Sequence, residues 1–530
     1  MCKFKRFGVM LDMSRNAVMK PEQVKRFIDL IHGMGYNALG LYVEDTYEIK
    51  DEPYFGYLRG RYTGEEIKDI DSYAKSKGVE VIPYIQTLAH LSTLASQSAY
   101  QGIFDIEDVL LIDEPKTYEL IEKMFKACSE HFSSRNINIG MDEAFKVGLG
   151  KYLKKHGFCD RYEIILRHLN KVVDIAVKYG FKPTMWSDMF FRIACDDYLP
   201  AEIPESVKKL VPEKVGLDFW DYYRKDKAFV DNMFVSHKAF GREVGYVGGA
   251  WTWHGFAPLA WQTLSTMRPS IQSAIDNGIE NVMIAMWGDN GHECSFYALI
   301  HTLYAISQFA QGNFDMDSIK EGFKGYIDLD FDDFMLLDLP NINLPDDVLG
   351  DPSNPCKVLL YQDVFLGKYD HTVENNPERP FGEYAIKIGE AKKRVGEYAY
   401  VFDFYHKLCL ALEIKAGIGV KLRKDYKAGN KEGLKGLLVQ LKELEQRIKD
   451  LHSSFFYLWH KENKGHGFEV HDARLGGLIM RISTCCKRLN DYLEGKIDCI
   501  EELEEIILKH GDGKTLRSYS YLGTITNNRV

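Results

Sequence analysis

Short apolar runs alternate with longer amphipathic segments along the first 312 residues. The apolar runs are nearly continuous, as in parallel strands covered on both faces, and the segments between them have helical spacing. Strands are predicted at residues 6–12, 37–43, 80–85, 136–142, 183–188, 214–221, 244–251 and 280–287. Helices are predicted at 21–34, 65–78, 116–132, 161–179, 204–210, 225–240, 260–277 and 295–311. Eight strand–helix units predict an α/β fold, a (β/α)8 TIM barrel over residues 1–312.

A doubly wound open sheet is the structural alternative for this pattern. Such folds usually have a phosphate-binding G-x-G-x-x-G motif directly after a strand, and this chain has none. The closed barrel is therefore favoured.

The chain changes character after residue 312. Prolines become frequent between residues 339 and 380, which predicts an irregular, proline-rich connector over 313–383. Beyond it, apolar residues recur with helical spacing, for example between Leu434 and Ile448. This predicts a C-terminal α-helical domain over 384–530, whose helices carry no catalytic motif. We expect its helices to pack against the barrel, and a homodimer contact is among their expected roles.

Charge and composition exclude several kinds of partner. The net charge is −10, from 67 basic and 77 acidic residues, which argues against nucleic acid and anionic membranes as partners. No apolar run approaches the roughly 18 residues of a membrane-spanning helix. The N-terminal apolar run is too short for a secretory signal, and the ten cysteines show no C-x-x-C spacing. We therefore expect a cytoplasmic protein with reduced thiols.

Polar and aromatic residues gather where the predicted strands end. The active site of such a barrel lies at the carboxyl ends of its strands. Six of the seven tryptophans lie at or just after these ends, namely Trp186, Trp220, Trp251, Trp253, Trp261 and Trp287. Aromatic faces pack on the apolar face of a pyranose, while charged side chains bind its hydroxyls. The pattern predicts a sugar-binding pocket.

Two adjacent carboxylic acids, Asp142 and Glu143, follow the fourth strand. Glycoside hydrolysis needs an acid that protonates the leaving oxygen and a second group that stabilises the positive centre. Consecutive strand residues point in opposite directions unless the strand turns. One carboxyl can then face the leaving group while the other binds a neighbouring substituent of the sugar.

The strand ends together resemble glycoside hydrolase family 20, the exo-β-N-acetylhexosaminidases. The likeness spans residues 4–312, and it looks closest to a compact branch that lacks the family's N-terminal α+β domain. It is carried by Asp12 to Arg15, the Glu44-Asp45 pair, Gln86 to His90, Asn138 to Glu143, Trp186, and Trp287 to Asp289. The resemblance implies release of terminal β-linked GlcNAc or GalNAc from small carbohydrate substrates, with no cofactor and no metal.

The resemblance also implies a substrate-assisted mechanism. The 2-acetamido oxygen of the sugar would be the nucleophile, giving an oxazolinium intermediate and net retention. Glu143 would act as general acid and then as base, while ionised Asp142 orients the acetamido group. Like charges on neighbours separate two pKa values, which supports this division of roles.

The remaining roles follow residue by residue from the same resemblance. Arg15 would bind the 3- and 4-hydroxyls, and Asp289 would bind the 4- and 6-hydroxyls. His90 with Glu44 would form a relay to the acid, although Asp45 is the other candidate for contact with His90. The aromatic substrate-binding residues would be Trp287 as platform, Trp186 and Trp220 around the acetamido methyl, and Trp251 and Trp253. The family's acetamido-binding tyrosine is expected at Tyr222 or Tyr223, and parity with Trp220 favours Tyr222.

Two other functions fit parts of the pattern. A two-carboxylate retaining β-glycosidase would pair Glu143 with Asp188 or Asp289, and a non-catalytic barrel would only bind sugar. A metal-dependent hydrolase is disfavoured because strand one lacks H-x-H and the chain lacks H-E-x-x-H. The preference at sugar C4 stays open.

Overall fold

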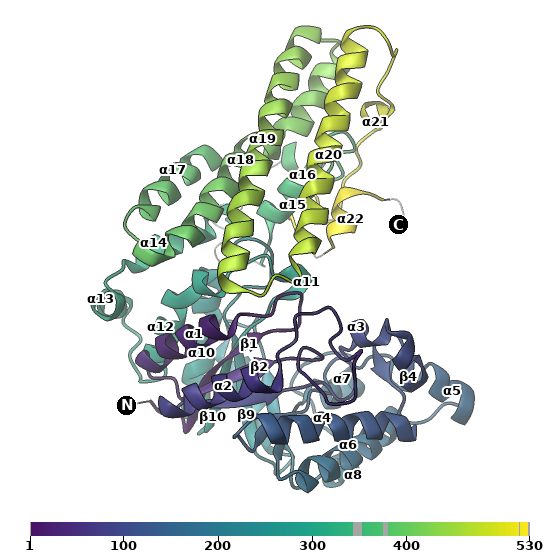
Figure 1. Cartoon of the computed structure of the whole chain (residues 1–530), viewed down its shortest axis with the longest axis vertical. Helices are drawn as coiled ribbons and strands as arrows, with labels where there is room; N and C mark the ends of the chain where they lie inside the picture. Colours follow the sequence, from purple (N-terminus) through teal and green to yellow (C-terminus); the bar gives the residue numbers. More distant parts are fainter. Residues whose placement is uncertain (1, 343–351, 375–379, 519, 528–530) are drawn as a thin grey trace. The chain divides into compact units, whose positions relative to one another are not determined.

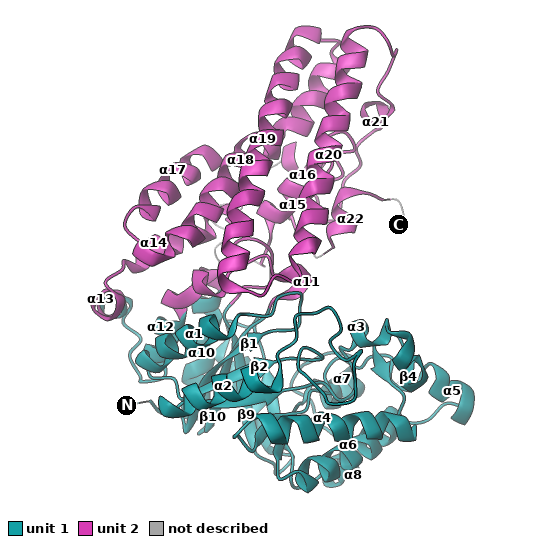
Figure 2. Cartoon of the chain, in the orientation of Figure 1, with its two compact units in different colours: residues 1–250, 263–287, 303–319 teal, residues 251–262, 288–302, 320–530 magenta. Residues whose placement is uncertain are grey.

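The computed structural model describes residues 2–342, 352–374, 380–518 and 520–527. The chain forms two compact units (Figure 2). We call residues 1–250, 263–287 and 303–319 the barrel unit, and residues 251–262, 288–302 and 320–530 the helical unit. The two units interleave along the chain, and the domain boundaries at residues 312 and 383 therefore stay predictions from the sequence.

The barrel unit contains a closed barrel of eight parallel strands, and the predicted fold class is confirmed (Figure 1). The strands are ordered β1-β10-β9-β8-β7-β6-β3-β2 around it. They are β1 (Arg6–Asp12), β2 (Ala38–Tyr42), β3 (Glu80–Tyr84), β6 (Asn136–Asn138), β7 (Lys182–Trp186), β8 (Gly216–Trp220), β9 (Val244–Gly249) and β10 (Asn281–Met286). Leu11 pairs with Met286 on one side and Leu41 on the other, which closes the barrel. Burial on both faces explains why these strands are continuously apolar.

Helices follow the strands as the periodicity predicts. They are α1 (Pro21–Gly33), α2 (Gly64–Ser76), α4 (Pro115–His131), α6 (Arg161–Lys178), α8 (Glu205–Leu210), α9 (Lys227–Lys238), α10 (Ala260–Asp276) and α12 (Ile300–Phe309), the last preceded by η2 (Phe296–Leu299). Their starts have recognisable caps: Thr63 and Glu66 form a capping box on α2, and the Asp160 side chain caps α6.

Seven of the eight predicted strands end one to four residues early, and two of these ends have a clear local cause. The strand predicted over 136–142 stops at Asn138, because Gly140 and Met141 adopt positive φ values and turn the chain. The strand predicted over 183–188 stops at Trp186, because Asp188 begins α7 (Asp188–Cys195). Other short elements also lie in the loops after strands, where the pattern is too short for a periodicity. These are α3 (Ser92–Ala95), η1 (Ser98–Ile103), β4 (Phe104–Ile106), β5 (Val109–Leu110), α5 (Lys151–His156) and α11 (Asp289–His292).

Three long helices dominate the helical unit (Figure 1). They are α18 (Ala399–Lys427), α19 (Lys431–Glu462) and α20 (Phe468–Leu493), and each packs on the next. Apolar residues at helical spacing, among them Leu437, Leu441 and Leu444, are buried along α19. Further elements are α17 (Phe381–Lys392), η5 (Gly396–Tyr398), α21 (Glu501–Glu504) and α22 (Tyr521–Ile525). None of the helices in the described ranges has the length and apolar character needed to cross a bilayer.

The segment predicted as an irregular connector is largely helical where it is described. It contains α13 (Met316–Ile327), α14 (Phe331–Met335), η3 (Leu336–Asn341), α15 (Pro355–Tyr361) and α16 (Asp370–Glu374). Pro355 stands in the first turn of α15, where proline is tolerated because the N–H groups of that turn have no hydrogen-bond acceptor within the helix. Proline density therefore gave a wrong prediction of irregular structure here. Pro345 and Pro377 lie outside the described residues.

Buried polar contacts hold two segments within the helical unit. Glu293, in the segment after β10, lies 2.9 Å from both Lys357 Nζ and Arg474 Nη1. The Asp338 carboxylate accepts hydrogen bonds from the backbone N–H groups of Ala260 and Trp261. These contacts connect residues of 251–262 and 288–302 to η3, α15 and α20 of the same unit.

Candidate active site

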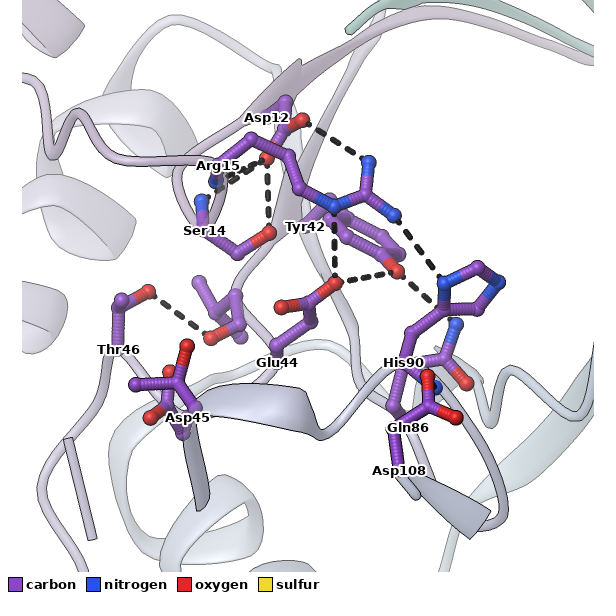
Figure 3. A network of polar contacts seen from close by, with 12 residues as sticks. Asp12, Ser14, Arg15, Tyr42, Glu44, Asp45, Thr46, Gln86, His90 and Asp108 are labelled. Atoms are coloured by element: carbon purple, nitrogen blue, oxygen red, sulfur yellow. Dashed lines mark hydrogen bonds and ion pairs between the residues drawn. The ribbon is translucent and has the colours of Figure 1, made fainter. Parts of the chain in front are cut away.

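Arg15, in the loop after β1, is surrounded by acceptors from two neighbouring strand ends. Its Nε donates to Glu44 Oε1 at 3.1 Å, and its Nη1 lies 3.5 Å from Asp12 Oδ2. Tyr42 also donates to Glu44 Oε1, at 3.0 Å. Figure 3 shows the Arg15 side chain extending from Asp12 past Glu44 toward His90. Burial raises the pKa of Glu44 to about 7, although Arg15 and His90 lower it in part.

Gln86 connects this cluster to the acidic pair. Its Nε2 donates to the Tyr42 hydroxyl at 3.0 Å and to Asp142 Oδ1 at 2.7 Å, and its Oε1 accepts from the backbone N–H of Met141. Gly140 makes this approach possible, because a Cβ there would lie 2.0 Å from Gln86 Oε1 and its φ is +74°. The turn at Gly140 thus fixes Asp142 against Gln86.

His90 lies between the two acidic side chains. Its Nε2 is 3.1 Å from Asp142 Oδ2 and 3.7 Å from Glu143 Oε2. Burial alone would lower the pKa of His90, but the Asp142 charge outweighs it and raises the pKa to about 9. Burial alone would raise the pKa of Asp142, but the charge of His90 and hydrogen bonds from His90 and Gln86 lower it. The two groups therefore form a buried ion pair at neutral pH.

Glu143 differs from its neighbour in both exposure and electrostatics. Its side chain is 37% exposed, whereas Asp142 is buried. Partial burial of the carboxyl, followed by the charge of Asp142, raises the pKa of Glu143, while the charges of His90, Arg192 and Arg15 partly offset this effect. A carboxylic acid that keeps its proton to higher pH and reaches solvent is suited to protonating a bound group.

Asp188 and Arg192, one turn apart on α7, support Glu143 from another side. Asp188 Oδ2 accepts from the backbone N–H of Glu143 at 3.1 Å and from Arg192 Nε at 3.3 Å. Arg192 Nη2 lies 3.8 Å from Glu143 Oε1. Burial, followed by the charge of Asp142, raises the pKa of Asp188 to about 7. Sequence reasoning did not select Arg192. The i, i+4 spacing of Asp188 and Arg192 was the available signal. This spacing brings two side chains together only on a helix, and a helix directly after β7 was not among those predicted.

Aromatic side chains of the barrel unit meet at the same strand ends. The Trp287 ring lies 4.7 Å from Tyr42 edge to face and 6.4 Å from Trp186. Trp287 donates a hydrogen bond to the Tyr222 hydroxyl, and the Tyr222 ring stacks on Trp220 at 5.3 Å. Tyr222 is buried whereas Tyr223 is 48% exposed, which favours Tyr222 as the inward-facing phenol.

Three predicted site residues belong to the helical unit. Trp251 and Trp253 stack with ring centroids 4.4 Å apart, and Asp289 is the first residue of α11. Asp289 follows Trp287 by two positions in the chain. Their roles toward a sugar stay predictions from the resemblance.

Arg15 takes part in the predicted relay between Glu44 and His90. Arg15 stands between the two side chains, because its Nη2 lies 3.5 Å from His90 Nδ1 while its Nε binds Glu44. Asp45 instead pairs with Arg59 at 3.2 Å. His90 contacts Asp142, the neighbour of Glu143, at 3.1 Å. In the described ranges, no cluster of three or more His, Cys, Asp or Glu residues has the arrangement of a metal site.

Two family models match this chain. The model of the catalytic domain of glycosyl hydrolase family 20 matches residues 4–230, and the model of the glycoside hydrolase 20C C-terminal domain matches residues 332–518. The two matched segments together take in more than half of the chain. The chain belongs to glycoside hydrolase family 20. The catalytic-domain match includes the candidate residues from Arg15 to Tyr222, and the second match lies in the helical unit.

Relatives of this family 20 chain include Hexosaminidase D from Homo sapiens and from Bos taurus. Each is 25% identical, over 228 and 229 residues respectively, and each match covers 40% of this chain. The matches cover 44% and 62% of those proteins, so the chain spans about half the length of these relatives. A solved structure of the GH20 exo-β-N-acetylglucosaminidase from Vibrio harveyi with N-acetylglucosamine is 17% identical, with a TM-score of 0.48. It covers 63% of this chain and 58% of that chain.

Proposed function

We propose that this chain is an exo-acting, retaining β-N-acetylhexosaminidase that releases terminal β-linked GlcNAc or GalNAc. One observation carries the proposal: the adjacent Asp142 and Glu143 have pKa values shifted in opposite directions while both contact His90. Two neighbouring carboxyls, one with a lowered and one with a raised pKa, suit an acid beside a fixed negative charge. The names of the hexosaminidase relatives support the same activity.

In the first step, the glycosidic bond from C1 to the leaving oxygen breaks. The acetamido oxygen of the same sugar forms a bond to C1, and Glu143 gives its proton to the leaving oxygen. The intermediate is an oxazolinium ion, whose positive charge the Asp142 carboxylate stabilises. Because the nucleophile belongs to the substrate, the reaction gains the advantage of proximity without a protein nucleophile.

In the second step, water attacks C1 and the bond from C1 to the acetamido oxygen breaks. Glu143, now ionised, takes a proton from the attacking water and returns to its starting state. Two displacements at C1 give net retention of configuration. Glu143 must therefore hold a proton in one step and lose it in the next, for which a pKa raised toward neutral is suited.

The other candidate residues would bind the sugar. Arg15 would donate to the 3- and 4-hydroxyls, with Trp287 as the platform under the ring and Trp186 and Trp220 around the acetamido methyl. Tyr222 would donate a hydrogen bond to the acetamido oxygen, since its hydroxyl oxygen already accepts one from Trp287. The sugar-binding roles of Asp289, Trp251 and Trp253 stay predictions from the resemblance.

Asp188 fits poorly as the nucleophile of a two-carboxylate glycosidase. Its side chain is 0% exposed, and its Oδ2 is occupied by the Glu143 backbone and Arg192. A nucleophile has to approach C1 of the substrate, which a fully enclosed carboxyl does not. The contacts of Asp188 instead support a role in positioning Glu143.

A panel of aryl β-glycosides that differ at C2 tests the proposal. We expect turnover of the 2-acetamido glycoside and at least about a hundredfold lower kcat/KM for the 2-hydroxy glycoside, because only the former carries the nucleophile. A thiazoline analogue of the oxazoline should inhibit competitively. Equal turnover of both glycosides, with a trapped 2-fluoroglycosyl adduct in mass spectrometry, would favour the two-carboxylate mechanism. Saturable sugar binding without turnover would indicate a non-catalytic barrel.

Replacing His90 with asparagine should shift the pH profile of kcat/KM to higher pH. The His90 charge lowers the pKa of both Asp142 and Glu143, so both pKa values rise when it is removed. The acidic limb needs ionised Asp142 and the basic limb needs protonated Glu143, so both limbs move upward. Asparagine tolerates the positive φ of 58° at this position. An unmoved profile between pH 4 and pH 9 would contradict the assignment.

The partners and location follow from the same proposal and from the sequence. The substrate would be a small carbohydrate with a terminal N-acetylhexosamine. A cytoplasmic location and a homodimer contact through the C-terminal helices are proposed from the sequence alone.

A further inference from the structure

An exposed aromatic ring and a cation lie together beside Glu143. Phe145 follows the acid by two residues, and its backbone N–H donates to the Glu143 carbonyl at 2.6 Å. Its side chain is 48% exposed, which is unusual for a phenylalanine so near a buried ion pair. The Arg192 guanidinium lies 5.1 Å from the centroid of the Phe145 ring. The ring and the cation therefore form one small surface at the end of β6.

Asp188 fixes this surface relative to the acid. One buried carboxylate oxygen accepts from both the Glu143 backbone, at 3.1 Å, and Arg192 Nε, at 3.3 Å. Arg192 is thereby held with its Nη2 3.8 Å from Glu143 Oε1. Since Arg loses less conformational freedom when its planar group is already oriented, the cation is prepared for a ligand.

The two cations near Glu143 mark two sides of the acid. His90 lies near Oε2 and pairs with Asp142, which the proposed function assigns to the acetamido group of the released sugar. Arg192 lies near the other oxygen, Oε1. The general acid must come within hydrogen-bond distance of the leaving oxygen, so the leaving group has to lie against an exposed side of Glu143. The Arg192 side, next to exposed Phe145, is the side not taken by Asp142.

Resting on the proposed function, we infer that Phe145 and Arg192 bind the leaving group of the substrate, and that this group is a pyranose. The Phe145 face would pack on the C–H groups of that ring, and the guanidinium would donate to its hydroxyls. Asp188 acts as a positioning residue, because it contacts Arg192 and Glu143 and is itself fully enclosed. The chain would then recognise two consecutive sugars of an oligosaccharide.

Replacing Phe145 with alanine tests this inference through a ratio of two substrates. N,N′-diacetylchitobiose and methyl N-acetyl-β-glucosaminide have the same sugar to be released and similar alcohol leaving groups, but only the first has a second pyranose. We expect kcat/KM to fall about tenfold for the disaccharide and less than twofold for the methyl glycoside, which is the size of one lost aromatic contact. Equal losses on both substrates, or no loss on either, would overturn the inference.

Binding measurements keep the inference testable whatever the catalytic outcome. In a Glu143→Gln background, F145A should raise the Kd of the disaccharide about tenfold and leave that of the methyl glycoside unchanged. The Ki of the thiazoline, which lacks a leaving group, should also stay unchanged in F145A. A raised Ki would indicate damage to the acetamido side and would count against the inference. If the wild type hydrolyses neither substrate, the proposed function fails, while the two Kd values still decide whether this surface binds a pyranose.

Matched variants control for general effects. Leu210→Ala removes another exposed apolar side chain, 60% exposed, at the end of α8 of the barrel unit, and it should leave the substrate ratio unchanged. Arg192→Met should lower the ratio as F145A does. Arg135→Met removes another Arg–Phe contact, in which the Arg135 guanidinium lies 5.6 Å from the centroid of the Phe181 ring, directly before β6. This variant should leave the substrate ratio unchanged. Asp188→Asn keeps an oxygen acceptor for both donors, so it should retain a substrate ratio that Asp188→Ala loses.

Discussion

Replacing Glu143 with glutamine is expected to lower kcat/KM for N,N′-diacetylchitobiose about a thousandfold, the usual size of a lost general acid. Glutamine has nearly the same shape but no proton to transfer to the leaving oxygen. The hydrogen bond from the backbone N–H of residue 143 to Asp188 does not depend on the side chain, so the turn should persist. Initial rates of N-acetylglucosamine release, followed by chromatography at several substrate concentrations, measure the effect.

The leaving group provides an internal check on that result. A dinitrophenyl glycoside needs little protonation of its leaving oxygen, so bond cleavage in Glu143→Gln should lose much less with this substrate than with the disaccharide. Glu107→Gln changes an exposed glutamate paired with Lys146, and it should leave both rates unchanged. Near-wild-type turnover of the disaccharide by Glu143→Gln would show that another residue is the acid.

Replacing Asp142 with asparagine should lower kcat for the aryl 2-acetamido glycoside about 10²- to 10³-fold, comparable to the loss of one oriented group that stabilises a transition state. Asparagine retains an oxygen for the hydrogen bond from Gln86, but it removes the charge that would stabilise the oxazolinium ion. The same change removes the charge that raises the pKa of Glu143, so that pKa should fall. A stopped assay of phenol release over a pH series measures both effects.

The direction of the pH shift separates Asp142 from His90. The basic limb of kcat/KM should move to lower pH in Asp142→Asn, because Glu143 loses its proton earlier, whereas it moves to higher pH in His90→Asn. Asp113→Asn changes a carboxylate held by Arg167 and Lys171 and should leave the profile in place. If Asp142→Asn retained the wild-type preference for a 2-acetamido over a 2-hydroxy substrate, Asp142 would not orient the acetamido group.

The helical unit contains helices where the frequency of proline predicted irregular structure. Frequent prolines predicted irregular structure over 313–383, but Pro355 stands in the first turn of α15 and Pro340 lies within η3. Proline is disfavoured in the interior of an α-helix but not at its start. The frequency of proline in a segment therefore does not distinguish a loop from several short helices. The contacts of Glu293 with Lys357 and Arg474 join positions far apart in the chain, and no local pattern contains them.

The sequence by itself determined the barrel, because burial on both faces of parallel strands leaves continuous apolar runs such as Phe7 to Leu11. It also determined that Asp142 and Glu143 follow a buried strand, and that tryptophans lie at the ends of other strands. Only the tertiary structure decided which of these side chains meet. The turn at Gly140 and Met141, the position of Arg15 between Glu44 and His90, and the support of Glu143 by Asp188 and Arg192 depend on backbone angles and distances between separate strands. Periodicity reports the face that a residue occupies, whereas the pKa of a carboxyl depends on neighbours within a few ångströms that only the folded chain brings together.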